Sequence, residues 1–419
     1  MEFINSISRN GLENTIRRYK PSLFVSLHIF KDRKTNLLII LLGTFAVILI
    51  TFINAFRKKK PILKNYHTLI YVPNEKYTRF ITAFIQVYKK NYLIISDSKL
   101  SIDSITLNEA SSFSRYHFFT MFLSNYAKLL KTCYRKGDLS KLKLFYWATL
   151  SILRREVLLE SIFSKVKFEN YFSLHPIDSF HSLIEVEFKK QFRSTYAIRP
   201  TTTGCSLENK FYFCDNLFYK SQEELEIYKS MCNPEINFLH GGLMYPDLKY
   251  HIKNRYFKQW LFFDTCTSKD EIRNQCRIDN INSLLDFAKL NGVLVYFKFH
   301  PGLLEKEKQQ TVLLLSKYSN VTVINNEIPW DIIDLSVGFS STIFFDSILR
   351  GIPVYDIVQS FCFLDDLMST YKINDVSDYK KILEFYSNRE FIIQDQYKWL
   401  CNKYNYPNGL LNMSAILSK

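Results

Sequence analysis

Two stretches in the second half of the chain decide the fold: VLVYFKFHP at residues 293–301 and LSVGFSSTIFFDSILRGIPVYDI at residues 335–357. In each stretch, a strand-length run of apolar residues ends abruptly at polar or turn-forming residues. The second stretch continues with a helix-length segment and then another short apolar run. Strands that alternate with helices pair in parallel. The pattern therefore predicts a doubly wound sheet whose ligands bind at the carboxyl ends of its strands.

The same alternation extends in both directions and predicts an α/β chain with two Rossmann-like β/α domains. We expect the first domain at residues 61–245 and the second at residues 256–400. The polar stretch at 241–258, which contains two adjacent glycines, is the expected connection. Residues 401–419 are expected to form a tail that packs back on the first domain.

One long apolar segment precedes both domains. Residues 35–56 (TNLLIILLGTFAVILITFINAF) carry no charge. As a helix they would extend roughly 33 Å, enough to cross a bilayer core. We predict a transmembrane helix here, after a basic segment at residues 1–34; a buried core helix and a helix lying in the membrane plane are the alternatives. Basic residues flank the segment on both sides, so the positive-inside rule assigns no orientation.

The net charge of +15 raises the question of an anionic partner. The sequence contains no recognition helix, zinc-finger spacing or RNP-type aromatic strand, so we expect no nucleic-acid partner. Basic residues cluster beside the apolar segment, which favours a membrane surface. The eight cysteines include no C-x-x-C pair, a pattern typical of buried thiols in a reducing compartment. We therefore expect the catalytic part to be cytosolic, attached to the inner membrane.

The first candidate site follows the strand at residues 293–299. His300 comes directly after this strand, so it should lie at the carboxyl edge of the sheet, where it could donate a hydrogen bond to a phosphate or transfer a proton. Pro301 prevents the strand from continuing. Lys298 lies two residues earlier and is a further candidate for phosphate binding.

The second candidate site is the segment Gly338-Phe339-Ser340-Ser341-Thr342, where a strand ends and a helix begins. Ser340 or Ser341 is a suitable N-cap residue. A helix N-terminus exposes backbone amides and the positive end of the helix dipole, and both attract a phosphate. The hydroxyls of Ser340, Ser341 and Thr342 would add hydrogen-bond donors. Plain helix capping is the alternative interpretation.

Together, "YFKFHP" and "LSVGFSSTIFFDSILRGIPVYDI" resemble the C-terminal domains of bacterial GT-B glycosyltransferases that use CMP-sugars. These are the sialyltransferases and polysialyltransferases, with the capsular Kdo transferases as relatives. The resemblance covers about a quarter of the chain, residues 260–357. It implies a GT-B fold in which an acceptor-side first domain and a nucleotide-binding second domain face a cleft. It also implies nucleotide binding by His300, Pro301 and the Ser340–Thr342 hydroxyls, and inverting transfer without a metal or other cofactor. Lys298 and Gly338, which lie in the same two stretches, are further candidates for nucleotide binding. CDP-glycerol-type polymer transferases are similar in this region, so the nucleotide stays open.

The first domain departs from that family's pattern. Sialyltransferases of this kind carry an acidic pair followed by glycine, which supplies the general base, and this sequence has no such motif. Four residues near predicted strand ends are the candidate substitutes: Glu75, Asp97, Asp215 and His240. The pair Asp365-Asp366 is better explained as a solvated helix face than as a metal site. We therefore predict no metal site.

These observations predict a membrane-anchored glycosyltransferase that moves a sugar from a nucleotide-sugar, preferably a CMP-sugar, to a glycan or glycolipid acceptor. Two alternatives remain open. One is a CDP-glycerol or other polyol-phosphate transferase of the same fold. The other, favoured by the missing acidic motif, is a catalytically inactive subunit of a glycan-assembly complex.

Overall fold

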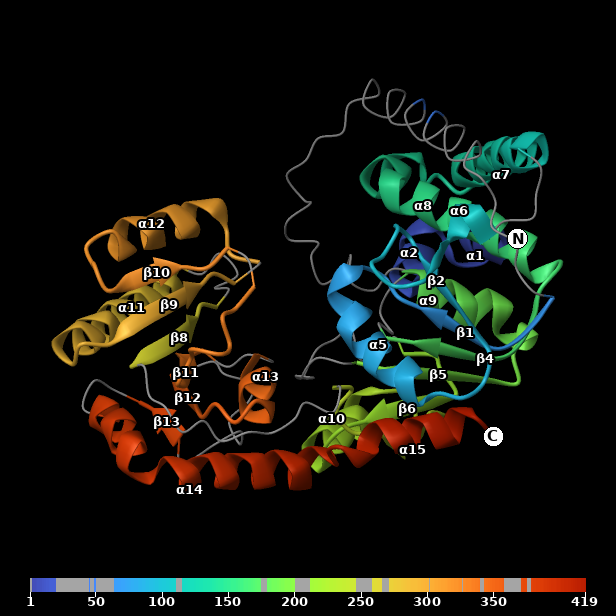
Figure 1. Cartoon of the computed structure of the whole chain (residues 1–419). Helices are drawn as coiled ribbons and strands as arrows, with labels where there is room; N and C mark the ends of the chain where they lie inside the picture. The colour runs from blue at the N-terminus through green and yellow to red at the C-terminus, as the bar shows by residue number, and fades with distance from the viewer. Residues whose placement is uncertain are drawn as a thin grey trace. The chain divides into compact units, whose positions relative to one another are not determined.

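The computed structural model divides the 419-residue chain into two compact units (Figure 1). Unit 1 comprises Met1–Pro246 and Asn405–Lys419, and unit 2 comprises Asp247–Tyr404. The structure describes residues 2–19, 45, 49, 64–110, 115–174, 179–199, 212–245, 258–265, 271–300, 302–325, 327–339, 343–357, 371–374 and 378–419.

Unit 1 is built on a parallel sheet, whose described part has seven strands in the order β3-β2-β1-β4-β5-β6-β7. The strands are β1 (Asn65–Tyr71), β2 (Tyr92–Ser96), β3 (Ile105–Thr106), β4 (Lys167–Ser173), β5 (Ser194–Ile198), β6 (Asn216–Tyr219) and β7 (Asn237–His240). The chain order reverses between β1 and β4, which are hydrogen-bonded neighbours. In parallel α/β sheets this switch point is where the strand ends leave a crevice for ligands.

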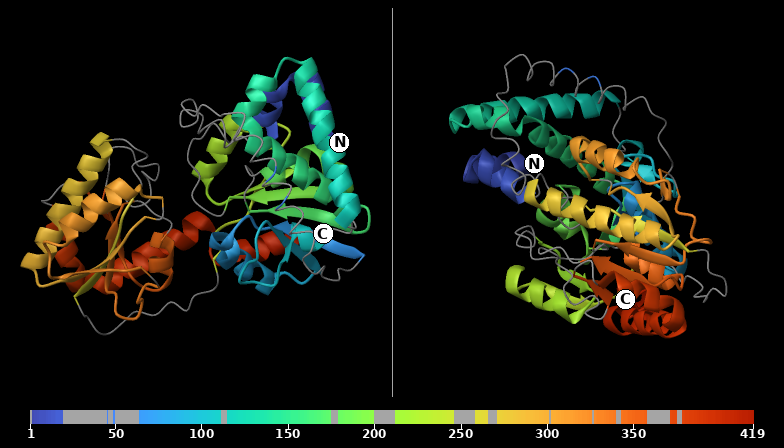
Figure 2. Two further views of the ribbon diagram at one scale, coloured as in Figure 1. Left: turned by 90° about the horizontal axis from the view of Figure 1, so that it is seen from above. Right: turned by 90° about the vertical axis from the view of Figure 1, so that its left-hand side faces the viewer.

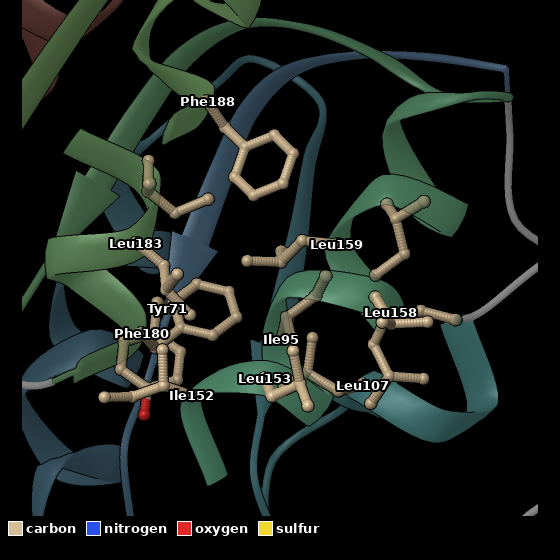
Figure 3. Close-up of a cluster of buried hydrophobic side chains, with 14 of the residues drawn as sticks. Tyr71, Ile95, Leu107, Ile152, Leu153, Leu158, Leu159, Phe180, Leu183 and Phe188 are labelled. Carbon is tan, nitrogen blue, oxygen red and sulfur yellow. The ribbon is translucent and has the colours of Figure 1, made fainter. Parts of the chain in front are cut away.

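Helices cover both faces of this sheet. They are α5 (Thr78–Val87), α6 (Leu107–Ala110), α7 (Arg115–Arg135), α8 (Leu139–Phe163), α9 (Ser179–Leu183) and α10 (Gln222–Met231), with the short helices η2 (Glu75–Tyr77), η3 (Ile184–Phe188) and η4 (Lys189–Gln191). Side chains of α6, α8 and α9 meet Tyr71 and Ile95 of the sheet in the main apolar core (Figure 3). This burial is the principal stabilisation of the unit.

The N-terminal helices belong to the same core. Helices α1 (Glu2–Asn10) and α2 (Leu12–Tyr19) bury Ile4, Ile7, Leu12 and Ile16 in the cluster that α7 and α8 also form. The backbone N–H of Leu12 donates to the Asp138 carboxylate at 2.8 Å, between α7 and α8. The segment predicted as basic, residues 1–34, therefore contains at residues 2–19 two helices whose apolar faces are buried in unit 1.

The C-terminal helix α15 (Asn408–Leu417) also packs in unit 1. The carbonyl of Leu417 accepts hydrogen bonds from Tyr88 at 3.4 Å and from Asn170 at 3.2 Å, which tie α15 to the sheet region. Figure 2 shows the same helix, coloured red, beside α5. The predicted boundary at residue 401 falls instead inside α14 (Tyr379–Tyr404), which belongs to unit 2.

Unit 2 has a parallel sheet whose described strands follow the order β10-β9-β8-β11-β12-β13. They are β8 (Gln259–Phe263), β9 (Leu294–Lys298), β10 (Val321–Val323), β11 (Leu335–Gly338), β12 (Val354–Ile357) and β13 (Lys372–Ile373). The connecting helices are α11 (Glu271–Leu290), α12 (Glu305–Leu315) and α13 (Ile343–Leu349). Crossovers between parallel strands are right-handed. The chain moves outward from β8 to β9 and β10 in one direction and from β11 to β12 in the other. The helices α11 and α12 therefore lie on one face of the sheet and α13 on the other. The switch point lies between β8 and β11.

The strand prediction differs from the structure at two points. The run at residues 293–299 lacks alternating polar residues and so predicts a strand buried on both faces, but Leu294 is 49% exposed, because β9 lies next to the edge strand β10. The sequence at residues 211–218 predicts a strand over that range, whereas β6 begins only at Asn216. Because of this later start, Asp215 lies before the first residue of β6, at the amino edge of the sheet.

Among the described residues, none of the helices combines the length and the apolar character needed to cross a bilayer. The predicted transmembrane segment, residues 35–56, lies outside the described residues apart from Phe45 and Leu49. The membrane-spanning helix therefore stays a prediction.

Candidate active site

The carboxyl edge of the unit 2 sheet brings together several predicted site residues. His300 lies two residues beyond β9, and Gly338 ends β11. Strand β8 lies between β9 and β11, so the two residues leave the same edge on either side of β8. This edge, at the switch point, is where the fold places ligands.

His300 has a defined tautomer. The backbone N–H of Gly302 donates to Nδ1 of His300 at 3.0 Å, so Nδ1 must be unprotonated. Burial lowers the pKa of His300 below its ordinary value of 6.5, which favours the neutral ring. The neutral ring then carries its proton on Nε2, which has no hydrogen-bond partner among the described residues. His300 is thus arranged to donate one hydrogen bond from Nε2.

Lys298 and Gly338 have structural roles that the sequence did not reveal. The backbone carbonyl of Lys298 accepts a hydrogen bond from the N–H of Asp264 at 3.0 Å, which joins β9 to the end of β8. A Cβ added at Gly338 would lie 2.6 Å from the backbone oxygen of Phe263. Close packing of β11 against β8 therefore explains the glycine without a ligand. Whether Lys298 and Gly338 also bind a nucleotide stays a prediction.

The other predicted nucleotide-binding residues, Pro301, Ser340, Ser341 and Thr342, lie outside the described residues. The flanking backbone is described. The N–H of Leu303 donates to the carbonyl of His300 at 3.1 Å, so the chain turns directly after β9, as predicted. Helix α13 begins at Ile343, directly after the predicted hydroxyl residues.

Sequence reasoning missed a buried ion pair at this edge. Asp264 follows β8, and both of its carboxylate oxygens lie 2.7 Å from Nη1 of Arg277 in α11. Both side chains are fully buried. Burial raises the pKa of Asp264, and the guanidinium of Arg277 opposes that shift. Nη2 of Arg277 donates to Thr311 in α12 at 2.9 Å, so the pair links β8 to two helices.

Asp264, like His300, directly follows an apolar run in the sequence, and this position could have identified it as a residue of the carboxyl edge. No local pattern marks Arg277, whose partner depends on how α11 packs. A cavity of about 370 Å³ lies between the first turns of α11 and α12, lined by Asn274, Glu307 and Gln310 among others. The predicted nucleotide-binding residues that the structure describes, Lys298, His300 and Gly338, do not line it.

In unit 1, the first two candidate general bases are engaged with neighbouring side chains. The carboxylate of Glu75 accepts hydrogen bonds from the N–H of Ser101 at 3.0 Å and from its hydroxyl, and these bonds lower the pKa of Glu75. Asp97 forms an ion pair with Arg155 and accepts a hydrogen bond from Tyr71 at 3.0 Å. Both residues follow strands at the carboxyl edge, but their arrangement suits loop anchoring more than proton transfer.

Asp215 lies at the opposite edge of the sheet. It precedes β6, and in a parallel sheet the amino ends of the strands form the edge away from the ligand crevice. The structure therefore contradicts the prediction that Asp215 faces the same edge as the other candidates. Its carboxylate lies 2.6 Å from Nζ of Lys189 and 2.9 Å from the backbone N and Oγ1 of Thr195.

His240 is the last residue of β7 and lies at the carboxyl edge. Its ring is exposed and stacks on Tyr219, with ring centroids 5.1 Å apart. No hydrogen bond to the ring is present among the described residues. Glu75, Asp97 and His240 are all exposed at the predicted edge, and among the described residues His240 is the one of the three whose side chain makes no hydrogen bond.

The described residues contain no group of three or more His, Cys, Asp or Glu side chains that could hold a metal ion. Asp365 and Asp366 lie outside the described residues, so the interpretation of that pair stays a prediction.

Two parallel-sheet α/β units of this kind define the GT-B class of folds. No family model matches the sequence, and no curated protein matches it. Solved structures do match. The UDP-GlcNAc 2-epimerase from Neisseria meningitidis, bound to UDP-GlcNAc, aligns with a TM-score of 0.51 and 12% identity over 85% of this chain and 100% of the epimerase.

Two further solved structures resemble the chain to the same degree. The UDP-GlcNAc 2-epimerase from Methanocaldococcus jannaschii, in complex with UDP-GlcNAc and UDP, has a TM-score of 0.51 and 10% identity, covering 84% of this chain and 99% of its own. The UDP-forming α,α-trehalose-phosphate synthase from Burkholderia vietnamiensis has 0.50 and 7%, with the same coverages. At such identities the likeness establishes the fold alone, and the resemblance to CMP-sugar transferases stays a prediction.

Proposed function

We propose that the chain is a glycosyltransferase that moves a sugar from a nucleotide-activated donor to a glycan or glycolipid acceptor, with inversion and without a metal or other cofactor. The observation that carries this proposal is His300. Its neutral ring, with Nδ1 occupied by Gly302, presents Nε2–H at the carboxyl edge of a sheet with the strand order of nucleotide-binding folds.

The proposed chemistry follows from the charge that develops in the reaction. As the bond between the sugar and the phosphate breaks, negative charge accumulates on the leaving phosphate. Nε2–H of His300 and the hydroxyls of Ser340, Ser341 and Thr342 would donate hydrogen bonds to that charge. Donors already oriented before the reaction lower the barrier more than water does, because they need no reorganisation.

We assign the general base to His240 in preference to the three carboxylates. Glu75 and Asp97 already accept hydrogen bonds from neighbouring side chains, and Asp215 lies at the other edge of the sheet. A neutral imidazole can remove a proton from an acceptor hydroxyl. With His240 as the general base, the reaction needs no carboxylate base. The absence of the acidic-glycine motif is then compatible with activity.

The identity of the donor nucleotide distinguishes the proposed CMP-sugar transferase from the alternative functions. The sequence motifs favour a CMP-sugar, whereas the structural neighbours described above act on or release uridine nucleotides. Purified protein should be incubated with CMP-sialate, CMP-Kdo, CDP-glycerol and UDP-GlcNAc, and nucleotide release, transfer and epimerisation measured. Turnover of a CMP-sugar supports the proposal, turnover of CDP-glycerol indicates the polyol-phosphate alternative, and UDP-GlcNAc turnover indicates a uridine donor. Absence of turnover with every donor would leave the inactive-subunit alternative.

The packing of α1 and α2 limits how residues 35–56 can meet a membrane. Since α1 and α2 share a buried core with the rest of unit 1, residues 2–19 and the residues from 64 onward must lie on the same side of the bilayer. A single crossing by residues 35–56 would separate them. We propose instead that this segment attaches to one face of the inner membrane, the cytosolic one, with both ends on that face.

Two features support attachment to one face. Phe45 and Leu49 are four residues apart, on the same side of a helical turn, and are 66% and 45% exposed. The basic residues on both flanks of the segment would then lie together at the anionic cytosolic surface. A crossing helix would place one of these basic flanks on the far side.

A further inference from the structure

Helix α7 lies at the periphery of unit 1 and exposes large apolar side chains on its outer side (Figure 1). Its inner side packs against α8 and α1, and Leu129 and Cys133 of that side belong to the main core. On the outer side, Tyr134 is 74% exposed and Leu130 is 37% exposed. Leu139, the first residue of α8, is 40% exposed. Exposed apolar side chains that lie together mark interaction surfaces more often than isolated ones do.

The outer side of α7 consists of two neighbouring stripes, which we call the α7 surface. Residues three or four positions apart lie next to each other on a helix. This spacing gives an apolar stripe of four residues, Leu123, Ala127, Leu130 and Tyr134. The same spacing gives a basic stripe of three residues, Lys128, Lys131 and Arg135. Leu123 is half-buried and the other six are exposed, so both stripes are open to a partner.

The basic stripe has no acidic neighbour to balance it. Residues 110–137 include neither Asp nor Glu. Asp138, the next residue, is 6% exposed, and its carboxylate accepts the hydrogen bond from the Leu12 N–H. The exposed side chains described on the adjacent helix α1 are those of Asn5, Ser8, Arg9 and Asn10, none of them negative. The positive charge of the stripe is therefore directed to the outside of the molecule.

Helix stability explains only part of this pattern. The helix dipole favours basic residues in the last turn, where Arg135 lies. Lys128 and Lys131 lie before that turn, where the effect has faded. The dipole also gives no reason for exposing Leu130 and Tyr134. The two stripes together fit an anionic partner that can also take up apolar side chains.

We propose that the α7 surface lies against the anionic cytosolic leaflet of the membrane. The apolar stripe enters the boundary between headgroups and acyl chains, and the basic stripe contacts lipid phosphates. A nucleic acid would attract the lysines and the arginine but would leave Leu130 and Leu139 in water. A lipid surface is therefore the partner that matches both stripes.

This contact orients unit 1 at the membrane and adds to the attachment proposed for residues 35–56. Helix α2, which precedes that segment in the chain, packs against α8, so the segment is joined to the same group of helices as α7. A single weak membrane signal gives only reversible binding. Residues 35–56 hold the protein at the membrane, and the α7 surface determines which side of unit 1 faces it. The proposal does not depend on the transferase chemistry.

The test introduces a tryptophan into the α7 surface of the full-length protein. Tyr134→Trp is mixed with vesicles of phosphatidylglycerol and of phosphatidylcholine brominated on its acyl chains, because bromine quenches tryptophan only at short range. After subtraction of the wild-type signal from the four native tryptophans, the added emission should shift to shorter wavelength and be quenched. Leu313→Trp is the matched control, at a residue of α12 that is 69% exposed, and should show neither effect.

Neutralising the basic stripe should remove the contact. In Tyr134→Trp protein, the combined changes Lys128→Gln, Lys131→Gln and Arg135→Gln should lower the quenching roughly fivefold or more, since each base near an anionic surface contributes about fivefold in binding. High salt should have the same effect, because exposed charges are screened. The control removes three exposed lysines of α12 in the same way and should leave the quenching unchanged: Lys306→Gln, Lys308→Gln and Lys317→Gln.

The possible outcomes separate this surface from the other proposals. Equal quenching of the two introduced tryptophans, no quenching of Tyr134→Trp in protein that sediments with the vesicles, or quenching that survives loss of the basic stripe would overturn the α7 surface alone. Absence of vesicle binding at low salt would overturn the attachment of residues 35–56 as well. Binding of single-stranded DNA that requires the basic stripe, without quenching by vesicles, would indicate a nucleic-acid surface instead. Donor turnover is measured without vesicles and tests the transferase proposal separately.

Discussion

At the scale of single residues, two properties suit His300 to donate a hydrogen bond: its location at the carboxyl edge of the sheet and the protonation state of its ring. Its strand determines where it lies, and the Gly302 N–H determines which nitrogen carries the proton. The first feature follows from an apolar run in the sequence. The second requires the turn after the strand and the partial burial of the ring, which lowers its pKa.

We expect His300→Asn to lower kcat by roughly 10²–10³-fold, since it removes one donor to developing charge. Asn can keep an acceptor near the position of Nδ1 for Gly302 but has no donor at the position of Nε2. His300→Gln places an amide N–H near that position and should retain more turnover than the Asn variant. KM should change little, because the lost interaction forms mainly in the transition state. His117→Ala, at an exposed histidine on α7, is the control; equal turnover in all variants would exclude His300.

Substitution of Gly338 distinguishes two reasons for a glycine at this position: close packing of β11 against β8, and space for a ligand. Gly338→Ala brings a Cβ to 2.6 Å from the Phe263 carbonyl oxygen, so β8 and β11 must move apart. We expect a loss of about 1–3 kcal/mol in the free energy of unfolding, as for other overpacked sites. Chemical denaturation measures it. Unchanged stability with lost nucleotide binding would instead show that the glycine serves the ligand.

At the scale of elements, the Asp264–Arg277 pair joins β8, α11 and α12 at the carboxyl edge of unit 2. Strand β8 is central to the sheet, and both helices begin at that edge. Arg277 reaches Asn274 within its own helix and Thr311 in the next, so one side chain sets the spacing of three elements. The ion pair thus stabilises the packing of the elements next to the proposed nucleotide site.

We expect Arg277→Met to destabilise the protein by about 3–5 kcal/mol, because it leaves the buried Asp264 carboxylate without its cation. Asp264→Asn should be destabilising as well. The double variant should be much more stable than the sum of the two losses predicts, because neither charge is then left uncompensated. Denaturant unfolding of the four proteins measures this coupling, and strictly additive losses would contradict the proposed pairing.

At the scale of the whole chain, both ends of the sequence belong to unit 1. Helices α1 and α2 complete its core, and α15 returns to it after the chain has formed unit 2. The apolar segment at residues 35–56 therefore lies between two parts of one unit. This connectivity is the reason for proposing attachment to one face of the membrane in place of a crossing.

We expect the protein to remain with membranes in high salt, because apolar burial is not screened. A protease-sensitive tag at either terminus should be cleaved in inside-out inner-membrane vesicles and protected in spheroplasts. Replacing residues 35–56 by a polar linker should release the protein while its unfolding transition is retained. Cleavage of the N-terminal tag in spheroplasts would show that the segment crosses the bilayer and that α1 and α2 do not pack as described.

The sequence by itself determined the local elements and their order. The apolar runs at 92–96 and 335–339 and the helix at 222–231 coincide closely with β2, β11 and α10. Periodicity and turn residues act over a few positions, so a single sequence carries them in full. The placement of His300 after a strand followed from the same local signals.

Only the tertiary structure decided which residues meet. Asp215 lies at the amino edge because β6 starts at Asn216 and not at residue 211, and the pairing of β6 with β5 sets that start. The pairing of Asp264 with Arg277, the choice of which side of α7 is buried, and the inclusion of α1 and α2 in the core depend on contacts between distant segments. Such contacts are set by how apolar faces are buried together, and no local pattern in the sequence specifies the partner.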